Sequence, residues 1–282
     1  MKLLRYYQDG VIKPGLLDKK GQIRALSEYV EDISDNNLLP EAIKTLRGLN
    51  VDKLPLVHGE PRLAACVGNI GKFICIGLNY ADHAAETNAQ IPSEPLIFSK
   101  YTSAICGPND NIIIPKNSTK TDWEVELGVV IGKGGKRISQ EDALNHVAGF
   151  CVINDLSERE AQLERQGQWV KGKSFDSFGP MGPYLVTPDE IEDYNNLHLW
   201  LEVDGKRYQD GNTKTMVYKV PKLINYLSQF FSLQPGDVIS TGTPPGVGLG
   251  QKPTPIYLRA GQKVRLGIDG LGVQTQYTID EE

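Results

Sequence analysis

The chain has 282 residues, of which 40% are apolar and 23% are charged, a balance typical of a globular protein and not of a disordered one. Its 30 basic and 35 acidic residues are mixed along the sequence and give a net charge of −5, so we expect neither nucleic acid nor a membrane as a partner. No apolar run approaches the roughly 18 residues of a membrane span, and charges come too early for a signal peptide, which predicts a cytoplasmic protein.

The first 60 or so residues predict a small N-terminal unit. Turn-forming residues separate short strands that we expect over residues 3–7, 13–17 and 22–26. Pro40 predicts the start of a helix, and Gly48 follows its expected end. Residues 51–63 contain Pro55, Gly59 and Pro61 and are typical of a linker. We therefore predict two domains, 1–62 and 63–282.

The next feature is a pair of carboxylates in an alternating run. Between Trp123 and Ile131, apolar residues alternate with Glu124, Glu126 and a glycine, which predicts a half-buried strand. Side chains two apart share a face, so the two carboxylates would lie about 7 Å apart. On a face beside the core they would repel each other unless a cation or hydrogen-bond donors lay between them. The alternative is an exposed face that carries two solvated glutamates.

A third carboxylate favours the cation. Residues 148–153 are continuously apolar and predict a buried strand, and Asp155 follows its end. Three carboxylates suit a hard divalent ion, and magnesium, manganese or calcium could bind to such a site. Zinc fits less well, because no His or Cys is nearby in the sequence.

Two side-chain pairs have helical spacing. His83 and Glu86 are three residues apart, so on a helix the carboxylate could orient the imidazole as a general base for water. Arg159 and Gln162 have the same spacing in the polar, helix-prone segment 156–165. For both pairs the alternative is an ordinary solvated helix face.

The segment 167–174 matches the phosphate-loop pattern G-x-x-x-x-G-K-[ST] letter for letter. That pattern binds phosphate only between a buried strand and a helix. Here a charged helical stretch precedes it, and residues 175–183 contain glycines and prolines that exclude a helix. We therefore expect no nucleotide site, although Lys173 is a notable cation in a glycine-rich segment.

The rest of the chain alternates strands with turns. One long amphipathic helix is predicted over residues 221–231, with its apolar face, including Phe230 and Phe231, in the core. Residues 237–248 run from a strand into a Gly/Pro loop, where backbone N–H groups and Thr243 could bind an oxyanion. Strands outnumber helices, so the sequence predicts a β-rich α+β fold.

Together these motifs resemble those of the fumarylacetoacetate hydrolase family from Phe73 to the C-terminus. The segments that carry the resemblance are residues 77–86, 124–128, 154–159, 172–175 and 240–244. The resemblance implies a mixed β-roll with a small N-terminal domain, assembled as a homodimer. It is strongest to bacterial members described as ureidoglycolate lyases and diketo-sugar-acid hydrolases.

The resemblance also implies roles for residues. Glu124, Glu126 and Asp155 match the ligands of magnesium, with manganese as the alternative. His83 and Glu86 match a water-activating dyad, and Lys173 matches a lysine that stabilises negative charge. Contacts with substrate, or support of the site, are implied for Arg159, Gln162 and Thr243. Many acylpyruvate-cleaving relatives have arginine where Leu78 stands, so Lys100 or Arg159 could bind the substrate carboxylate instead.

These observations lead to the hypothesis of metal-dependent hydrolysis of a carbon–carbon bond in a 2,4-diketo acid, which releases pyruvate or a related 2-oxo acid. The metal would chelate the 1-carboxylate and the 2-keto oxygen, and activated water would add to the 4-keto carbon. Ureidoglycolate lyase, 2-oxo-acid decarboxylase and dienoate isomerase are alternatives at the same site. Two further alternatives are nucleotide binding at residues 167–174 and a non-catalytic scaffold with a structural metal.

Overall fold

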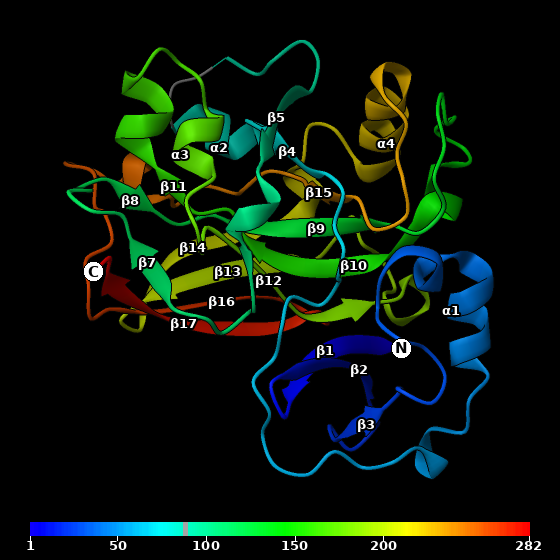
Figure 1. Cartoon of the computed structure of the whole chain (residues 1–282). Coiled ribbons are helices and arrows are strands. Elements are labelled where there is room, and N and C mark those ends of the chain that lie inside the picture. Colours follow the sequence, from blue (N-terminus) through cyan, green and yellow to red (C-terminus); the bar gives the residue numbers. More distant parts are fainter. Residues whose placement is uncertain (87–89) are drawn as a thin grey trace.

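The computed structural model describes residues 1–86 and 90–282, without the side chains of residues 84 and 85. In this part of the chain a ten-stranded mixed sheet lies against a five-stranded sheet, and helices cover the outer edges (Figure 1). This arrangement confirms the prediction of a β-rich α+β fold.

The large sheet runs in the order β3-β2-β1-β12-β10-β9-β15-β4-β5, and β6 pairs with β12 beside this path. Its strands are β1 (Lys2–Gln8), β2 (Val11–Leu17), β3 (Ile23–Ala25), β4 (Phe73–Gly77), β5 (Leu96–Lys100), β6 (Ile105–Cys106), β9 (Val125–Ile131), β10 (Val147–Asn154), β12 (Gly179–Val186) and β15 (Val238–Ser240). The second sheet contains β7 (Ile112–Ile114), β13 (His198–Val203), β14 (Lys206–Asn212), β16 (Lys263–Ile268) and β17 (Gly272–Asp280). A separate pair is formed by β8 (Thr121–Asp122) and β11 (Ser157–Glu158).

The α-helices are α1 (Pro40–Arg47), α2 (Ala81–Glu86), α3 (Val170–Lys173) and α4 (Val220–Phe230). Short 3-10 turns occur at Asp35–Leu38, Val51–Lys53, Thr102–Ala104, Ala143–His146, Pro188–Glu190, Thr213–Thr215 and Gly248–Gly250. No helix in the two described ranges is both long enough and apolar enough to span a bilayer.

The strand β9 is buried at every position, so the prediction of a half-buried strand is wrong. It pairs with β10 on one side and β15 on the other, and both of its faces are covered. Leu127 and Val129 belong to the core between the two sheets, whereas Val130 belongs to a second core beneath the N-terminal strands. The side chain of Glu126 therefore lies in the interior of the protein, where its charge needs compensation.

The N-terminal strands continue the large sheet. β1 pairs antiparallel with β12, with Leu3 opposite Leu185. Leu3 and Leu16 share one hydrophobic cluster with Ile153 of β10 and Val130 of β9. The segment 1–62 is thus joined to the rest of the chain by backbone hydrogen bonds and by apolar packing, and a domain boundary after residue 62 stays a prediction.

The segment after Asp155 differs from the helix expected over residues 156–165. Ser157 and Glu158 form β11, and a single five-residue π-helix follows at Glu160–Glu164. Gly172 of α3 packs so closely that a β-carbon there would lie 2.4 Å from the Glu158 carbonyl oxygen and 2.5 Å from the Gln162 nitrogen. This contact is between residues distant enough in sequence that local helix propensity could not reveal it.

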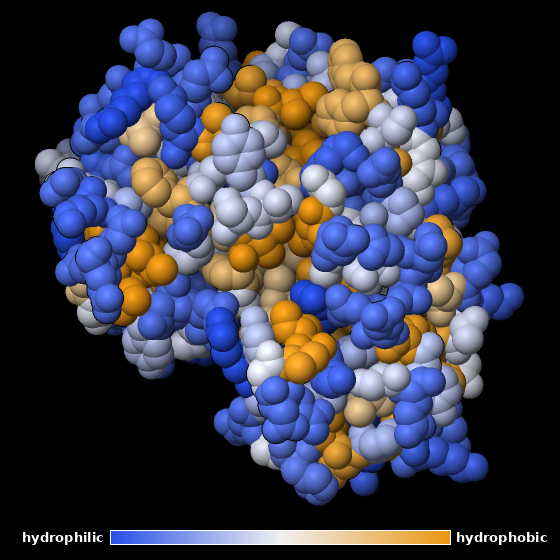
Figure 2. Space-filling view, in the orientation of Figure 1, coloured by the Kyte–Doolittle hydropathy of each residue, from blue (hydrophilic) through white to orange (hydrophobic). Residues whose placement is uncertain are grey.

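The predicted amphipathic helix is α4, and Leu223, Ile224 and Leu227 lie in the core as expected. Phe230 was predicted in the core but is 61% exposed at the C-terminal end of α4. Leu96 of β5 is also exposed. Figure 2 shows apolar atoms gathered on the upper part of this face, over β5 and α4.

We predict that Gly149→Ala destabilises the protein. A β-carbon at Gly149 would lie 2.5 Å from the carbonyl oxygen of Val186, so β10 and β12 would have to separate. Such overpacking costs about 1–3 kcal/mol. Thermal unfolding followed by circular dichroism would measure the change in Tm. Gly48→Ala is the matched control, since Gly48 is exposed with an ordinary φ of −76° and should change stability by less than about 0.5 kcal/mol. Equal Tm values for Gly149→Ala and wild type would contradict the argument.

Candidate active site

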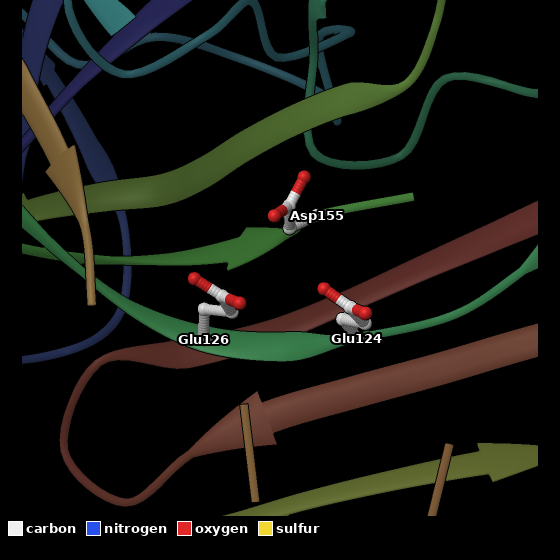
Figure 3. A group of neighbouring side chains, drawn as sticks. All are labelled: Glu124, Glu126 and Asp155. Carbon is white, nitrogen blue, oxygen red and sulfur yellow. The ribbon is translucent and has the colours of Figure 1, made fainter. Parts of the chain in front are cut away.

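Three carboxylates converge where β9 and β10 meet. Glu124 directly precedes β9, Glu126 lies on it, and Asp155 directly follows β10. One oxygen from each lies within 4.8 Å of the others, and all three side chains are buried. Figure 3 shows them pointing toward one another across the two strands. The structure thus brings together the three residues that the sequence selected.

The pairing of the two strands produces this convergence. Ile153 lies opposite Glu126 and Asn154 lies opposite Val125. The next residue, Asp155, donates its backbone N–H to the Glu124 carbonyl oxygen at 2.9 Å. Residues that are 27 or more positions apart in the sequence are therefore neighbours through sheet register.

Glu124 is held by two cations. Its Oε1 accepts from Arg159 Nη2 at 2.7 Å, and its Oε2 accepts from Lys173 Nζ at 2.7 Å. Burial acts to raise the pKa of Glu124, but the charges of Lys173 and Arg159 outweigh it and lower the pKa to about 2. Glu124 is therefore a carboxylate throughout the physiological pH range.

Glu126 has a different environment. Its Oε2 accepts from Ser240 Oγ at 2.6 Å and from the Gly242 N–H at 2.9 Å. Within the described ranges no hydrogen bond reaches Oε1. Burial, together with the negative charges of Asp155 and Glu124, raises the pKa of Glu126 well above its usual value. This carboxylate oxygen is the atom in the cluster that most needs a positive charge.

Asp155 is held by two lysines. Its Oδ1 accepts from Lys100 Nζ, and its Oδ2 accepts from Lys173 Nζ at 2.8 Å. Lys100 also donates to the Leu156 carbonyl oxygen at 2.8 Å and is only 2% exposed. Lys100, proposed from the sequence to contact substrate, contacts the Asp155 carboxylate instead and is not among the residues that line the cavity.

Arg159 holds the cluster from the other side. Besides Glu124 it donates to Asp122 Oδ2 at 2.8 Å and to Gln162 Oε1 at 2.9 Å. Because arginine only donates, the Gln162 oxygen must face it, and the amide nitrogen of Gln162 has no partner among the described residues. Asp122 in turn accepts from the N–H groups of Gly248 and Leu249 at 2.6 and 2.9 Å.

Asp122 and Ser240 also belong to the cluster, but neither was predicted from the sequence as a site residue. Asp122 is two residues before Glu124 in the same alternating pattern, which was a usable signal. Ser240 lies in the segment 240–244 that carries the family resemblance, and it reaches Glu126 because β15 pairs with β9.

A cavity of about 200 Å³ opens onto the cluster. Its polar lining consists of Glu124, Glu126, Arg159, Gln162, Lys173, Thr243 and His83. Its apolar lining consists of Ile76, Leu78, Phe98, Leu163, Trp169, Val247 and Leu249. Thr243 is fixed in this lining, because its hydroxyl donates to the Val125 carbonyl oxygen and accepts from Gln209, both at hydrogen-bonding distance. The cavity thus combines a charged site with a hydrophobic wall, as small-molecule sites generally do.

His83 and Glu86 meet on α2 as their spacing predicted. His83 Nδ1 lies 3.1 Å from Glu86 Oε2, and the Glu86 carboxylate accepts from the Gly246 N–H at 3.0 and 3.2 Å. A carboxylate at Nδ1 selects the tautomer with its proton on that nitrogen, which leaves the basic lone pair on Nε2. His83 also lines the cavity, so the solvated-pair alternative is wrong for this dyad.

The segment 167–174, which matches the phosphate-loop pattern, contributes Lys173 to the carboxylate cluster. Lys173 Nζ lies between Glu124 and Asp155 and is 1% exposed. The segment is preceded by a π-helix and forms only the four-residue α3, not a strand followed by a long helix. The geometry that binds phosphate is absent from this segment, as we expected.

The donor set fits a divalent cation. Four buried carboxylates, those of Asp122 and the three-residue cluster, face the three buried cationic side chains of Lys100, Arg159 and Lys173 in the described ranges. The excess negative charge and the unpartnered Glu126 oxygen lie where the cavity begins. Oxygen ligands alone suit magnesium or manganese.

Comparison with known proteins gives the family. The family model described as fumarylacetoacetate (FAA) hydrolase C-terminal matches residues 72–278. The chain belongs to this family. A Burkholderia lata protein that carries only the provisional name hydrolase is 62% identical over 280 residues, covering 99% of each chain.

Solved structures agree with this assignment. A fumarylacetoacetate hydrolase from Exiguobacterium antarcticum is 34% identical with a TM-score of 0.87, and all of each chain is covered. A maleylpyruvate hydrolase from Sphingobium sp. SYK-6, in complex with manganese(II) and pyruvate, is 27% identical with a TM-score of 0.80, again over the whole of both chains. These matches confirm the fumarylacetoacetate hydrolase-type fold that the sequence motifs implied.

We predict that Glu126→Gln abolishes stabilisation by metal without weakening the metal-free protein. Glutamine keeps an oxygen for Ser240 and Gly242 but removes the charge that repels Glu124 and Asp155. Magnesium or manganese at about 100-fold above Kd should stabilise the wild type by about 2.7 kcal/mol. Differential scanning calorimetry with and without each metal would measure this.

The control for this experiment is Glu164→Gln, since the side chain of Glu164 is 55% exposed on the π-helix. It should keep the full metal-induced rise in Tm. A Glu126→Gln variant that also kept the full rise would show that the three carboxylates do not form the metal site.

Proposed function

We propose that this enzyme hydrolyses a carbon–carbon bond in a 2,4-diketo acid and releases pyruvate or a related 2-oxo acid, with bound magnesium or manganese. The observation that carries the proposal is the buried carboxylate cluster in one cavity with the His83–Glu86 dyad. The pyruvate and manganese present in the Sphingobium maleylpyruvate hydrolase structure support the same class of substrate.

Glu124, Glu126 and Asp155 would hold the metal. The chemistry that a divalent cation supplies when bound in such a site is polarisation of the keto-acid oxygens and stabilisation of negative charge. The protein must then supply an activated water, a place for the proton, and contacts that hold the acyl end of the substrate.

His83 supplies the base. Water forms a bond from its oxygen to C4 of the substrate, and its proton moves to Nε2 of His83. Glu86 stabilises the imidazolium that results, because its carboxylate already contacts Nδ1 and is itself fixed by the Gly246 N–H. General base catalysis of this kind typically contributes about 10²–10⁴-fold in rate.

Cleavage follows from the tetrahedral C4. The C3–C4 bond breaks, C4 becomes the carbon of a carboxylic acid, and the electron pair moves to C3 to form the enolate of the 2-oxo acid. The proton held on His83 can then pass to C3, which restores the base and balances the reaction.

Lys173 stabilises the enolate as a permanent positive charge. Burial acts to lower the pKa of Lys173, but the charges of Asp155 and Glu124 outweigh it and raise the pKa above its usual value. The ammonium is therefore already in place and needs no reorganisation as negative charge develops.

Gln162 positions the substrate. Arg159 holds its amide oxygen, so the amide nitrogen is the donor that it offers to a carbonyl or hydroxyl oxygen in the cavity. Thr243 and Arg159 support the site through their bonds to Val125 and to Glu124.

We predict that His83→Ala lowers kcat by about 10²–10⁴-fold with little change in KM. The assay follows pyruvate release from 2,4-dioxopentanoate with magnesium or manganese. His198→Ala is the control, since the His198 side chain is 40% exposed, pairs with Asp210 on the second sheet and does not line the cavity; this variant should retain full activity.

A panel of substrates separates the alternatives. Full turnover of diketo acids by His83→Ala would refute the assignment of His83 as the general base. If the wild type cleaves no diketo acid, hydrolysis is refuted. Turnover of ureidoglycolate would then favour the lyase, turnover of an oxaloacetate-type acid the decarboxylase, and turnover of a dienoate the isomerase.

A further inference from the structure

The apolar residues of the cavity lining form a surface of their own. We expect the end of the substrate that leaves as the carboxylic acid to lie against this surface. We call Leu78, Phe98, Leu163, Trp169 and Leu249 the acyl wall. The rings of Trp169 and Phe98 meet edge to face with centroids 5.2 Å apart. Leu163 is 44% exposed and so lies at the rim of the cavity. A ligand that fills the cavity must lie against these side chains.

Among the described residues that line the cavity, neither the arginine nor the lysine is available for a second carboxylate. The lining contains one arginine and one lysine among the described residues. Arg159 is bound to Asp122, Glu124 and Gln162. Lys173 is bound to Glu124 and Asp155. Both therefore already neutralise carboxylates of the protein.

Close packing and hydrogen bonds position Trp169 and Leu78 in the acyl wall. Gly77 lets the Trp169 ring pack against the backbone, because a β-carbon there would lie 2.7 Å from Trp169 Cζ3. Leu78 has a φ of +53°, a left-handed conformation that is unfavourable for leucine. The following residue maintains it: Asn79 Nδ2 donates to the carbonyl oxygens of Tyr218 and Thr241, and Asn79 Oδ1 accepts from the Tyr218 N–H. The direction of the Leu78 side chain is thus set by a buried network, and it cannot easily swing aside for a charged group.

Resting on the proposed function, we propose that the acyl wall restricts this enzyme to 2,4-diketo acids whose acyl group is uncharged, and that Leu78 is the residue that sets this specificity. An uncharged acyl group can bury its surface on Leu78 and Trp169. A terminal carboxylate there would lose its hydration without gaining a partner, and an unpaired buried charge is strongly disfavoured. The Gln162 amide nitrogen, which has no partner among the described residues, can bind a neutral oxygen but carries no compensating charge.

The test compares a matched pair of substrates, 2,4-dioxoheptanoate and 2,4-dioxoheptanedioate, which differ in a terminal carboxylate. We expect the wild type to favour the monoacid by at least about tenfold in kcat/KM. Leu78→Arg should reverse the preference by raising kcat/KM for the dioate, mainly through KM, whereas Leu78→Met should keep the monoacid preference. Wild-type preference for the dioate, or equal kcat/KM for the two acids, would overturn the inference.

Binding provides a measurement that does not depend on turnover. Isothermal titration calorimetry with His83→Ala and magnesium should give a Kd for the monoacid at least about tenfold below that for the dioate, and the double variant His83→Ala/Leu78→Arg should reverse the order. If Leu78→Arg does not fold, Leu163→Arg at the exposed rim replaces it in both measurements.

The two proposals fail in different ways. If wild-type protein cleaves neither acid but His83→Ala still binds the monoacid more tightly, hydrolysis is wrong and the specificity inference stands. If wild-type protein cleaves both acids equally well, hydrolysis stands and the specificity inference is wrong.

Discussion

The electrostatic balance of a buried acidic cluster is the constraint on which the rest of this structure depends. Glu124, Glu126 and Asp155 each place one oxygen within 4.8 Å of the others in a buried region, where like charges repel strongly. Lys100, Lys173 and Arg159 neutralise most of that charge through short hydrogen bonds. They leave Glu126 with one oxygen that has no partner in the described chain. The protein is thus built with a local deficit of positive charge at the place where a cavity gives access to a cation.

The central sheet makes this cluster possible. The strands β9 and β10 are covered on both faces, so carboxylates at their ends enter a low-dielectric region without lying at a flexible surface. The register between them places Asp155 beside Glu124, and β15 brings Ser240 to Glu126 from the other side. A site on paired strands is held by many backbone hydrogen bonds at once, which keeps its geometry more constant than a loop could. The helix α2, which carries His83, lies at the periphery of this framework (Figure 1).

The polar and the apolar residues of the cavity have different roles. The polar residues are hydrogen-bonded to one another, so they set the charge of the site and the position of its groups but do not set substrate specificity. Among the polar side chains, Gln162 keeps an uncommitted donor because Arg159 fixes its amide oxygen. Discrimination between substrates is thereby left to the apolar residues, above all to Leu78, whose strained backbone is maintained by Asn79.

The residue pattern by itself determined the identity of the three carboxylates, the His83–Glu86 pair and the β-rich class of fold. These follow from short-range rules: two residues along a strand return to the same face, and three along a helix do so as well. Only the tertiary structure decided that β9 is buried on both faces, that Phe230 is exposed, and that residues 157–164 form a strand and a π-helix. It also decided that Lys100 holds Asp155, and that Asp122 and Ser240 belong to the site. Each of these depends on which distant strand or helix packs beside the residue, and that choice is made by the whole chain as it buries its apolar surface.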